Sequence, residues 1–271
     1  AICLIRLALP VTITSLNLNQ ATMPRELTNK VIVITGGAKG IGYEIAEKFV
    51  LNGAKTVYLL NINDKLGAEA SRRLNTKYGN DKAIYLKCDV TSNLDDISEK
   101  IFATHNVDVL INNAGILDDS NIKRTIDINV TGVLTWGLKF WEHMRKDKGG
   151  HGGTIINLAS IYGYRVDQFL PTYQSSKFAV MGFTKSLGHM YNYERSGVRV
   201  VAICPGFTET DLTAQPACWD ESLNEEFIRF LNKQAWQKAE VVGEAAVEIF
   251  RRADSGSAWL IEGSKLMEVP K

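Results

Sequence analysis

The sequence predicts an α/β protein with a single domain, built on a doubly wound, seven-stranded, mostly parallel sheet with helices on both faces. Short, continuous apolar runs alternate along the chain with longer segments of helical periodicity. The first clear run leads through a glycine-rich turn directly into a helical segment. The chain of 271 residues contains no repeat, linker or low-complexity tract, so one domain is expected.

Each element follows from a local pattern. Strands are expected where a run is apolar at every position, as burial on both faces requires. These runs lie at 31–35, 56–60, 83–86, 107–111, 154–158, 198–203 and 259–261. Helices are expected where apolar residues recur every three or four positions, at 41–51, 66–78, 93–104, 122–145, 173–193 and 241–252. With right-handed crossovers, this alternation indicates a Rossmann arrangement.

Two segments fall outside the alternation. Residues 1–22 are apolar but interrupted by Arg6 and Pro10, and we expect an extension that is disordered or loosely attached. This extension is too short and too broken for a membrane span, and a degenerate signal or transit peptide is the alternative. The domain then comprises residues 23–271. Residues 207–238 are polar and aromatic, and we expect them to form a lid over the carboxyl ends of the strands.

Composition argues against several classes of function. A net charge of +1 gives no indication of a nucleic-acid partner. The four histidines do not have the spacing of metal ligands, so no metal is assigned. The four cysteines have no close pairing, and Cys88 and Cys204 end apolar runs. Reduced, buried thiols and a cytoplasmic location are therefore expected.

A glycine-rich turn, Thr35–Gly42, joins the first strand of the domain to its helix. Gly36, Gly40 and Gly42 allow a tight turn and the close approach of a pyrophosphate. The unpaired N–H groups at the start of the helix would bind this anion. The turn therefore predicts a dinucleotide site.

Further motifs follow in a fixed order, namely Asn112-Asn113-Ala114-Gly115, Ser160, Tyr173-Gln174-Ser175-Ser176-Lys177 and Pro205-Gly206. Together with the glycine-rich turn, they resemble the short-chain dehydrogenase/reductase superfamily over about residues 30–263. The stretches 231–234 and 256–263 are similar to the branch of insect alcohol dehydrogenase and 15-hydroxyprostaglandin dehydrogenase. This resemblance implies an NAD(P)-dependent oxidoreductase that transfers a hydride between nicotinamide and an alcohol or carbonyl substrate.

The resemblance gives catalytic roles to four side chains. Tyr173 would be the general acid/base, and Lys177 lies one helical turn further on the same face. A free phenol has a pKa of about 10, which a nearby ammonium lowers. Ser160 would hold the substrate oxygen. Asn129 would anchor a water in a proton relay toward Lys177, and its poor helix propensity is consistent with such a role inside a predicted helix.

The resemblance also implies cofactor contacts. Asp89 and Val90 would contact adenine, although Asp89 could instead cap a turn or helix. The residues after the fourth strand would line the cofactor and stabilise the central sheet, and those after the sixth would hold the nicotinamide carboxamide. The complete expected set is Gly36, Lys39, Gly40, Ile41, Gly42, Asn61, Asp89, Val90, Asn112, Ala114, Gly115, Tyr173, Lys177, Pro205, Gly206 and Thr208.

The choice between NAD and NADP depends on the end of the second strand. An NAD site usually has an acidic residue about 20 residues after the glycine-rich turn. Here Asn61 stands at that position. It can bond a ribose hydroxyl without repelling a 2′-phosphate, and Lys39 is a base of the kind that NADP-using relatives carry. No Arg follows Asn61, and the branch favours NAD, with NADP as the alternative.

The candidate substrate pocket is aromatic and apolar, which suggests a hydrophobic secondary alcohol, a ketone or a lipid-like alcohol. Its expected residues are Ser160, Tyr162, Tyr164, Phe169, Leu170 and Phe207, with contributions from 210–230 in the lid, for example Leu212 and Trp219. Several of these could instead simply pack the core. Two alternative functions stay open, a catalytically idle binding or storage protein and a non-redox enzyme such as a dehydratase or epimerase. The resemblance further implies a homodimer or homotetramer paired through 122–145 and 173–193.

Overall fold

The computed structural model describes residues 12–13, 24–214 and 217–270 of the chain. Among these residues a sheet of nine strands runs through the domain in the order β1-β11-β10-β7-β6-β5-β2-β3-β4. Its strands are β1 (Thr12–Ile13), β2 (Val31–Thr35), β3 (Thr56–Asn61), β4 (Ala83–Lys87), β5 (Val109–Asn112), β6 (Gly153–Leu158), β7 (Val198–Pro205), β10 (Ala258–Glu262) and β11 (Lys265–Glu268). The seven predicted strands are present and parallel to one another, which confirms the predicted sheet.

Two strands that were not predicted extend one edge of this sheet. β11 pairs antiparallel with β10 across a tight turn at Gly263 and Ser264, both of which have positive φ angles. β1 pairs with β11, although Thr12–Ile13 falls inside the segment expected to be an extension. The rest of residues 1–22, apart from this strand, lies outside the described residues.

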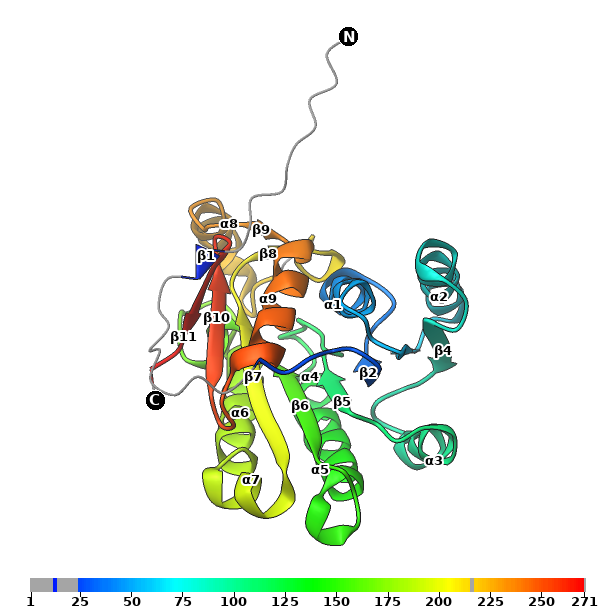
Figure 1. Ribbon diagram of the computed structural model, residues 1–271. Helices are drawn as coiled ribbons and strands as arrows, with labels where there is room; N and C mark the ends of the chain where they lie inside the picture. The colour runs from blue at the N-terminus through cyan, green and yellow to red at the C-terminus, as the bar shows by residue number, and fades with distance from the viewer. Residues whose placement is uncertain (1–11, 14–23, 215–216, 271) are drawn as a thin grey trace.

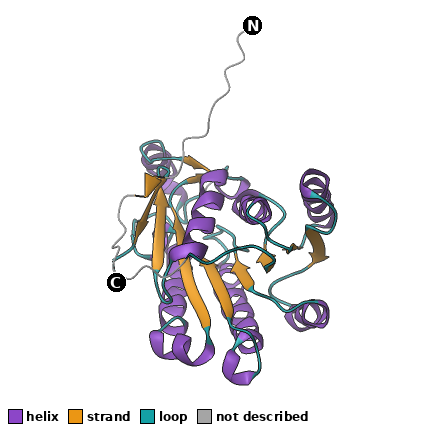
Figure 2. Cartoon of the chain, in the orientation of Figure 1, coloured by secondary structure: helices purple, strands orange, loops and turns teal. Residues whose placement is uncertain are grey.

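Helices cover both faces of the sheet (Figures 1 and 2). They are α1 (Gly40–Leu51), α2 (Asp64–Tyr78), α3 (Leu94–Thr104), α4 (Ile122–Ile126), α5 (Val133–Met144), α6 (Pro171–Leu187), α7 (Met190–Ser196), α8 (Asn224–Leu231) and α9 (Ala239–Arg252). Helices α1 and α9 pack together on one face, and α5 and α6 pack on the other. The doubly wound arrangement is therefore confirmed.

Alternate side chains of each central strand enter two different cores. On β2, Ile32 and Ile34 pack with side chains of α1 and α9, including the fully buried Phe49. The intervening Val31 and Val33 pack on the opposite face with α3 and α5. Since both faces are covered, the strand must be apolar at every position, which is why its sequence shows no polar alternation.

The helix predicted over 122–145 is not continuous. α4 ends at Ile126, a π-helical segment spans Asp127–Gly132, and α5 begins at Val133. The predicted helix over 173–193 is also divided, since α6 ends at Leu187 and α7 begins at Met190. Gly188 stands at that break, where a Cβ atom would lie 2.6 Å from the carbonyl oxygen of Val200 in β7.

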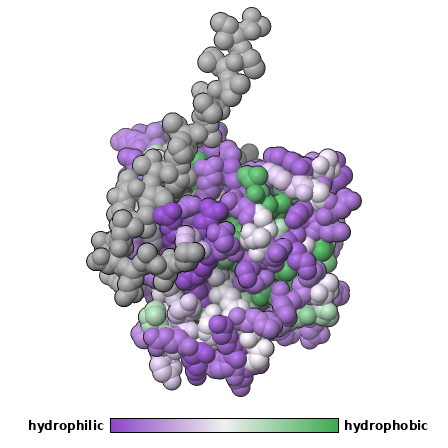
Figure 3. Space-filling model, viewed as in Figure 1, coloured by the Kyte–Doolittle hydropathy of each residue, from purple (hydrophilic) through white to green (hydrophobic). Residues whose placement is uncertain are grey.

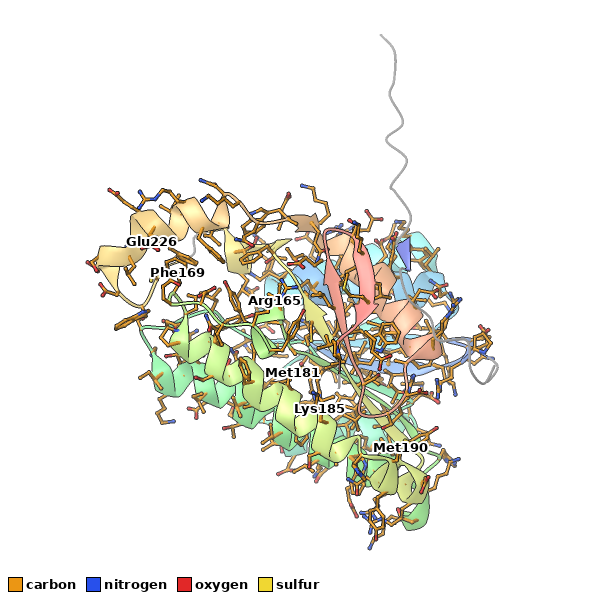
Figure 4. All side chains as sticks on the ribbon, turned by 90° about the vertical axis from the view of Figure 1, so that its left-hand side faces the viewer. Arg165, Phe169, Met181, Lys185, Met190 and Glu226 are labelled. Atoms are coloured by element: carbon orange, nitrogen blue, oxygen red, sulfur yellow. The ribbon has the colours of Figure 1, made fainter. Side chains whose placement is uncertain are left out.

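The described part of the 207–238 segment contains more regular structure than its weak helical pattern indicated. Its two ends meet, because β8 (Thr208–Glu209) pairs with β9 (Gln237–Lys238) in a small second sheet. Between them lie two 3₁₀ turns, Asp211–Thr213 and Glu221–Leu223, and then α8. Figure 4 shows α8 above the start of α6, with Phe169 between them.

Four general findings bear on the classes of function. Cys88, Cys204 and Cys218 are buried free thiols. Across the described ranges, no group of three His, Cys, Asp or Glu side chains could hold a metal ion, and no helix is long and apolar enough to cross a membrane. The face seen in Figure 3 is mostly hydrophilic, with small hydrophobic patches.

Candidate active site

A cavity of about 730 Å³ opens where the parallel strands end. Such a volume is typical of small-molecule and cofactor sites. Each of six strands contributes at least one wall residue at or after its carboxyl end, namely Gly36, Asn61, Asp89, Ala114, Ser160 and Gly206. This is the edge of the sheet at which ligands bind in doubly wound folds.

Glycines shape one end of this cavity. Gly36 and Gly40 have φ angles of +64° and +55°, a region that side chains disfavour. A Cβ atom on Gly36 would lie 3.0 Å from the Cα of Ala114, and one on Gly42 would lie 2.4 Å from the Gly36 carbonyl oxygen. Helix α1 begins in the same turn, after Lys39, and its first N–H groups have no partner within the helix. The bare backbone and these donors fit a dinucleotide pyrophosphate.

Asn113, rather than Asn112, forms the wall next to this turn. Asn113 Nδ2 donates to the carbonyl oxygens of Thr35 and Gly36, at 3.0 Å each. The sequence also predicted Asn112 at the cofactor, but its side chain points the other way, because residues alternate along β5. Asn112 Nδ2 donates to Asn157 Oδ1 at 2.9 Å, so it joins β5 to β6 and keeps only the predicted sheet role.

Residues after β3 and β4 line another part of the groove. Asn61, Asp89 and Val90 line it as predicted. The Asp89 carboxylate also accepts from Thr91 N and Oγ1, at 2.9 and 2.7 Å, so the alternative reading of a turn cap applies as well. The remaining predicted cofactor residues of the wall are Lys39, Gly40, Ile41, Gly115, Pro205, Gly206 and Thr208.

The predicted acid/base pair lies at the centre of the wall. Tyr173 and Lys177 come from successive turns of α6, and their exposures are only 7% and 6%. Lys177 Nζ lies 5.5 Å from the centroid of the Tyr173 ring and donates to the Leu158 carbonyl oxygen at 2.9 Å. Ser160, two residues after the end of β6, lines the cavity beside Tyr173. These three side chains are brought together as predicted.

Burial shifts the pKa values of the pair in opposite directions. It raises the pKa of Tyr173 to about 12, an effect that the Ser160 hydroxyl opposes and the Asp119 carboxylate reinforces. It lowers the pKa of Lys177 to about 8. The sequence predicted a lowered pKa for Tyr173 because of the neighbouring ammonium, but desolvation of the phenolate is the larger effect in the protein alone.

Asn129 lies beneath the wall rather than in it. Its Oδ1 accepts from Ile116 N at 2.9 Å, and its Nδ2 donates to Ile116 O at 2.8 Å and to Ser176 Oγ at 3.1 Å. The side chain, fully buried in the π-helical segment, therefore fastens the loop after β5 to α6. A Cβ atom on Gly115 would lie 3.3 Å from Asn129 Oδ1 and 3.7 Å from Lys177 Nζ. Both N–H donors of the Asn129 amide are engaged, while its Oδ1 accepts one of the two hydrogen bonds that an amide oxygen can accept, so the predicted water stays a prediction.

Apolar side chains close the cavity beyond Tyr173. The predicted Tyr162, Leu170, Phe207 and Leu212 line it. Three further candidates do not belong to the wall. Phe169 packs against Phe227 and Phe230, Trp219 donates to the Gln168 carbonyl oxygen at the surface, and Tyr164 packs at the edge of the core. Wall residues that the sequence analysis did not name include Leu117, Ile128, Phe227, Leu231 and Trp236, of which Phe227 lies in the 210–230 stretch expected to contribute.

These unnamed residues differ in how clearly the sequence indicates that they face the cavity. Phe227 and Leu231 are four residues apart, so the inward face of α8 could have been found from helical spacing. Leu117 and Trp236 lie outside the regular helices and strands of the sheet, and their inward orientation depends on tertiary packing. No local pattern identifies them.

Comparisons with known proteins agree with this geometry. A family model described as short chain dehydrogenase matches residues 30–220. Alcohol dehydrogenase 1 of Ceratitis cosyra is 33% identical over 247 residues, which is 90% of this chain and 95% of the relative. Human 15-hydroxyprostaglandin dehydrogenase [NAD(+)] is 36% identical over 187 residues, 68% of this chain and 70% of the relative. Both branches named by the sequence resemblance are therefore found.

A solved structure shares the fold. It comes from Beutenbergia cavernae, is provisionally assigned as an NAD(P)-dependent gluconate 5-dehydrogenase, and contains NADP at low occupancy. The TM-score is 0.72, with coverage of 88% of this chain and 97% of that one. At 23% identity, the similarity supports the fold alone.

Proposed function

Since this chain belongs to the short-chain dehydrogenase family and is an NAD(P)-dependent oxidoreductase, we propose that it interconverts a hydrophobic alcohol, secondary or lipid-like, and its carbonyl counterpart. The observation that carries this proposal is the buried Tyr173–Lys177 pair beside Ser160. The pair lies between a glycine cradle that fits a pyrophosphate and a pocket with apolar walls.

The residues of the wall would hold the dinucleotide along its length. The Gly36–Gly42 turn would bind the pyrophosphate, and Asn61, Asp89 and Val90 the adenosine. Lys177 and the Pro205–Thr208 stretch would hold the nicotinamide end. When bound, the cofactor accepts or supplies the hydride, while the protein contributes position and electrostatics.

Tyr173 would donate a proton to the substrate oxygen or accept one from it, and Ser160 would orient that oxygen. In carbonyl reduction Tyr173 would donate its proton, and a pKa of about 12 keeps this phenol protonated near neutral pH. In alcohol oxidation the phenol must first lose that proton, and the neighbouring Lys177 ammonium favours the phenolate. The same two side chains would thus serve both directions of the reaction.

We favour NAD over NADP. Lys39 could pair with a 2′-phosphate, but its Nζ lies 2.8 Å from Asp211 Oδ2. That carboxylate holds the cation and adds a negative charge at the same end of the groove. Asn61 supports either cofactor, because it can bond a ribose hydroxyl and carries no charge. A lower Michaelis constant for NAD than for NADP is expected.

The walls beyond Tyr173 support a hydrophobic substrate. Tyr162, Leu170 and Phe207 face this space together with Phe227 and Trp236 from the 207–238 segment. We infer that this segment acts as the lid over the substrate and selects it by shape. The names of the relatives, which act as alcohol and hydroxyprostaglandin dehydrogenases, agree with an alcohol of this kind.

We further propose a homodimer or homotetramer in the cytoplasm. Ile122, Leu138 and Phe178 are 65%, 48% and 43% exposed on the helices that the resemblance assigns to pairing. Large apolar side chains on neighbouring helices support such an interface. The buried free thiols Cys88 and Cys204 agree with a reducing compartment.

A cofactor-reduction assay with a panel of alcohols, run with NAD and with NADP, tests the proposal. Tyr173→Phe is expected to lower turnover by about 10²- to 10⁴-fold while the fold and cofactor binding survive. Tyr191→Phe, at an exposed position of α7, is the matched control and should keep wild-type rates. Near wild-type activity in Tyr173→Phe would refute the mechanism. A wild-type protein that binds cofactor but oxidises no alcohol would favour the binding or storage alternative.

A further inference from the structure

The loop between β5 and α4 carries a carboxylate to which neither the sequence motifs nor the mechanism above gives a role. Asp119 Oδ1 accepts from Thr172 N at 2.6 Å, and its Oδ2 accepts from Tyr173 N at 3.3 Å. These are among the first N–H groups of α6, which have no partner within the helix. The helix that carries Tyr173 is therefore capped by a residue 53 positions earlier in the chain.

Local residues cannot provide this cap. Leu170 stands at the N-cap position, and its side chain accepts no hydrogen bond. Pro171 has no N–H group, so Thr172 and Tyr173 offer the donors that need partners. A carboxylate at this position is also favoured by the dipole of a helix of 17 residues.

The loop that presents Asp119 is braced on both sides. Asn129 bonds both backbone groups of Ile116, and Thr125 Oγ1 donates to the Asp118 carbonyl oxygen at 2.6 Å. Asn129 Nδ2 also reaches Ser176 Oγ, which donates in turn to the Tyr173 carbonyl oxygen at 2.7 Å. The Tyr173 N–H therefore bonds Asp119 of this loop directly. The Tyr173 carbonyl oxygen is connected through the Ser176 hydroxyl to Asn129, which holds the same loop.

We propose that Asp119 is a positioning residue for the reaction, which fixes the first turn of α6, and hence Tyr173, against the wall of the cavity. This proposal rests on the proposed function, because it presumes that Tyr173 exchanges the proton with substrate. Leu117 and Asp118 of the same loop line the cavity, so Asp119 also sets the distance between that wall and Tyr173.

Asp119 has an electrostatic effect on Tyr173 in addition to its structural effect on α6. The groups that face Tyr173 are Lys177 on the same helix, the Ser160 hydroxyl, the perpendicular Tyr162 ring and Asp119 from the loop. The negative charge of Asp119 raises the pKa of Tyr173 further, beyond the effect of burial. Removal of that charge should lower this pKa and make the phenolate available at lower pH.

Asp119→Asn and Asp119→Ala test the proposal in the full-length protein. In Asp119→Ala, kcat for alcohol oxidation should fall by about tenfold or more, and in Asp119→Asn by a smaller factor, with the Michaelis constant for the cofactor nearly unchanged in both. The rising limb of the kcat/KM profile should move to lower pH. Asp119→Asn should recover part of kcat, because its amide oxygen can still accept from Thr172 N, but should keep the shifted pH limb.

Asp108→Asn is the matched control. Asp108 is another partly buried carboxylate that accepts a backbone N–H, from Val31 at 2.8 Å, but it lies at the amino ends of β2 and β5, opposite the cavity. This variant should lose thermal stability without a change in kcat or in the pH limb. Amide hydrogen exchange gives a reading that does not depend on activity, since Thr172 and Tyr173 should exchange faster in Asp119→Ala.

The outcomes separate this proposal from the proposed function. An active wild type whose Asp119 variants lose stability but keep kcat and the pH limb would overturn the positioning role alone. Unchanged exchange at Thr172 and Tyr173 in Asp119→Ala would overturn the cap. A wild type without turnover on any alcohol would overturn the proposed function and this role with it. If Asp119→Ala does not fold, the kcat and pH readings of Asp119→Asn still decide the matter.

Discussion

At the scale of single residues, the proposed chemistry depends on two buried side chains that lose their contact with water. Tyr173 has its pKa raised to about 12 and Lys177 has its pKa lowered to about 8 because burial penalises the charged form of each. On an exposed helix the same spacing would leave both groups near their ordinary values. Burial therefore makes the pair neutral over part of the pH range where an exposed pair would be charged.

This burial predicts a pH dependence of stability that belongs to Lys177. Unfolding returns its pKa from about 8 to its ordinary 10.5, so between these values the unfolded chain binds more protons than the native protein. The Lys177 contribution to the free energy of unfolding should therefore rise with pH across this window, by at most about 1.4 kcal/mol per pH unit. Urea denaturation of the wild type and of Lys177→Met at pH 7, 8, 9 and 10 measures this contribution as the difference between their free energies of unfolding. A difference between the two proteins that does not change with pH would contradict the prediction.

The same scale shows which site residues a sequence can reveal. Tyr173 and Lys177 could be found because four positions along a helix place them on one face. Asp119 could not, because its partners lie 53 and 54 positions away and only the folded chain brings them together. Asn112 and Asn113 are adjacent residues of the same type, and only the structure shows that Asn112, the last residue of β5, contacts Asn157, whereas Asn113 contacts Thr35 and Gly36.

At the scale of elements, the main difference from the prediction is the π-helical segment Asp127–Gly132. Apolar residues recur at helical spacing over 122–145, so a single helix was expected. The segment places Asn129 opposite the backbone of Ile116. An amide side chain there can satisfy one donor and one acceptor at once, which neither an apolar nor a hydroxyl side chain can do with the same geometry.

Asn129→Leu is therefore expected to damage both stability and catalysis. It leaves the N–H and C=O of Ile116 without this partner, at a cost of about 2–4 kcal/mol in the free energy of unfolding. It also releases the loop beside Tyr173, so kcat should fall by about tenfold or more. Urea denaturation and steady-state kinetics measure the two effects. Asn121→Ala removes the N-cap of α4 and should cost only about 1 kcal/mol, with kcat unchanged. Equal effects of the two variants on kcat would argue against a special role for Asn129.

At the scale of the whole molecule, the alternation of apolar runs and helical segments was enough to predict the seven parallel strands and the edge of the sheet that holds the site. The unpredicted parts have few local constraints. β11 has four residues of mixed polarity, and β8 and β9 have two residues each. Such strands exist because a partner strand is already in place, so their own residues carry little signal.

Arg199 links the sheet to one of the helices that cover it, α9, and its removal should therefore destabilise the fold. It is the second residue of β7, 1% exposed, and donates at 2.6 Å to each of the carbonyl oxygens of Phe250 and Ala253 at the end of α9. The carbonyl end of the α9 dipole is negative, so it stabilises the Arg199 cation as a carboxylate would in an ion pair. Burial lowers the pKa of Arg199 to about 9, so it still carries its charge at neutral pH.

Arg199→Met should lower the free energy of unfolding by about 3–5 kcal/mol, because it leaves buried helix carbonyls without their donor. Urea denaturation measures the loss, and Arg199→Lys should recover part of it. Arg252→Met at the same helix end should cost no more than about 1 kcal/mol, because Arg252 is 44% exposed and pairs with Glu248 at the surface. In Arg199→Met kcat should not change below the melting temperature, since β7 reaches the cavity only at its other end, Pro205. Parallel losses of stability and kcat would show instead that the amino end of β7 and the active site are coupled through the sheet.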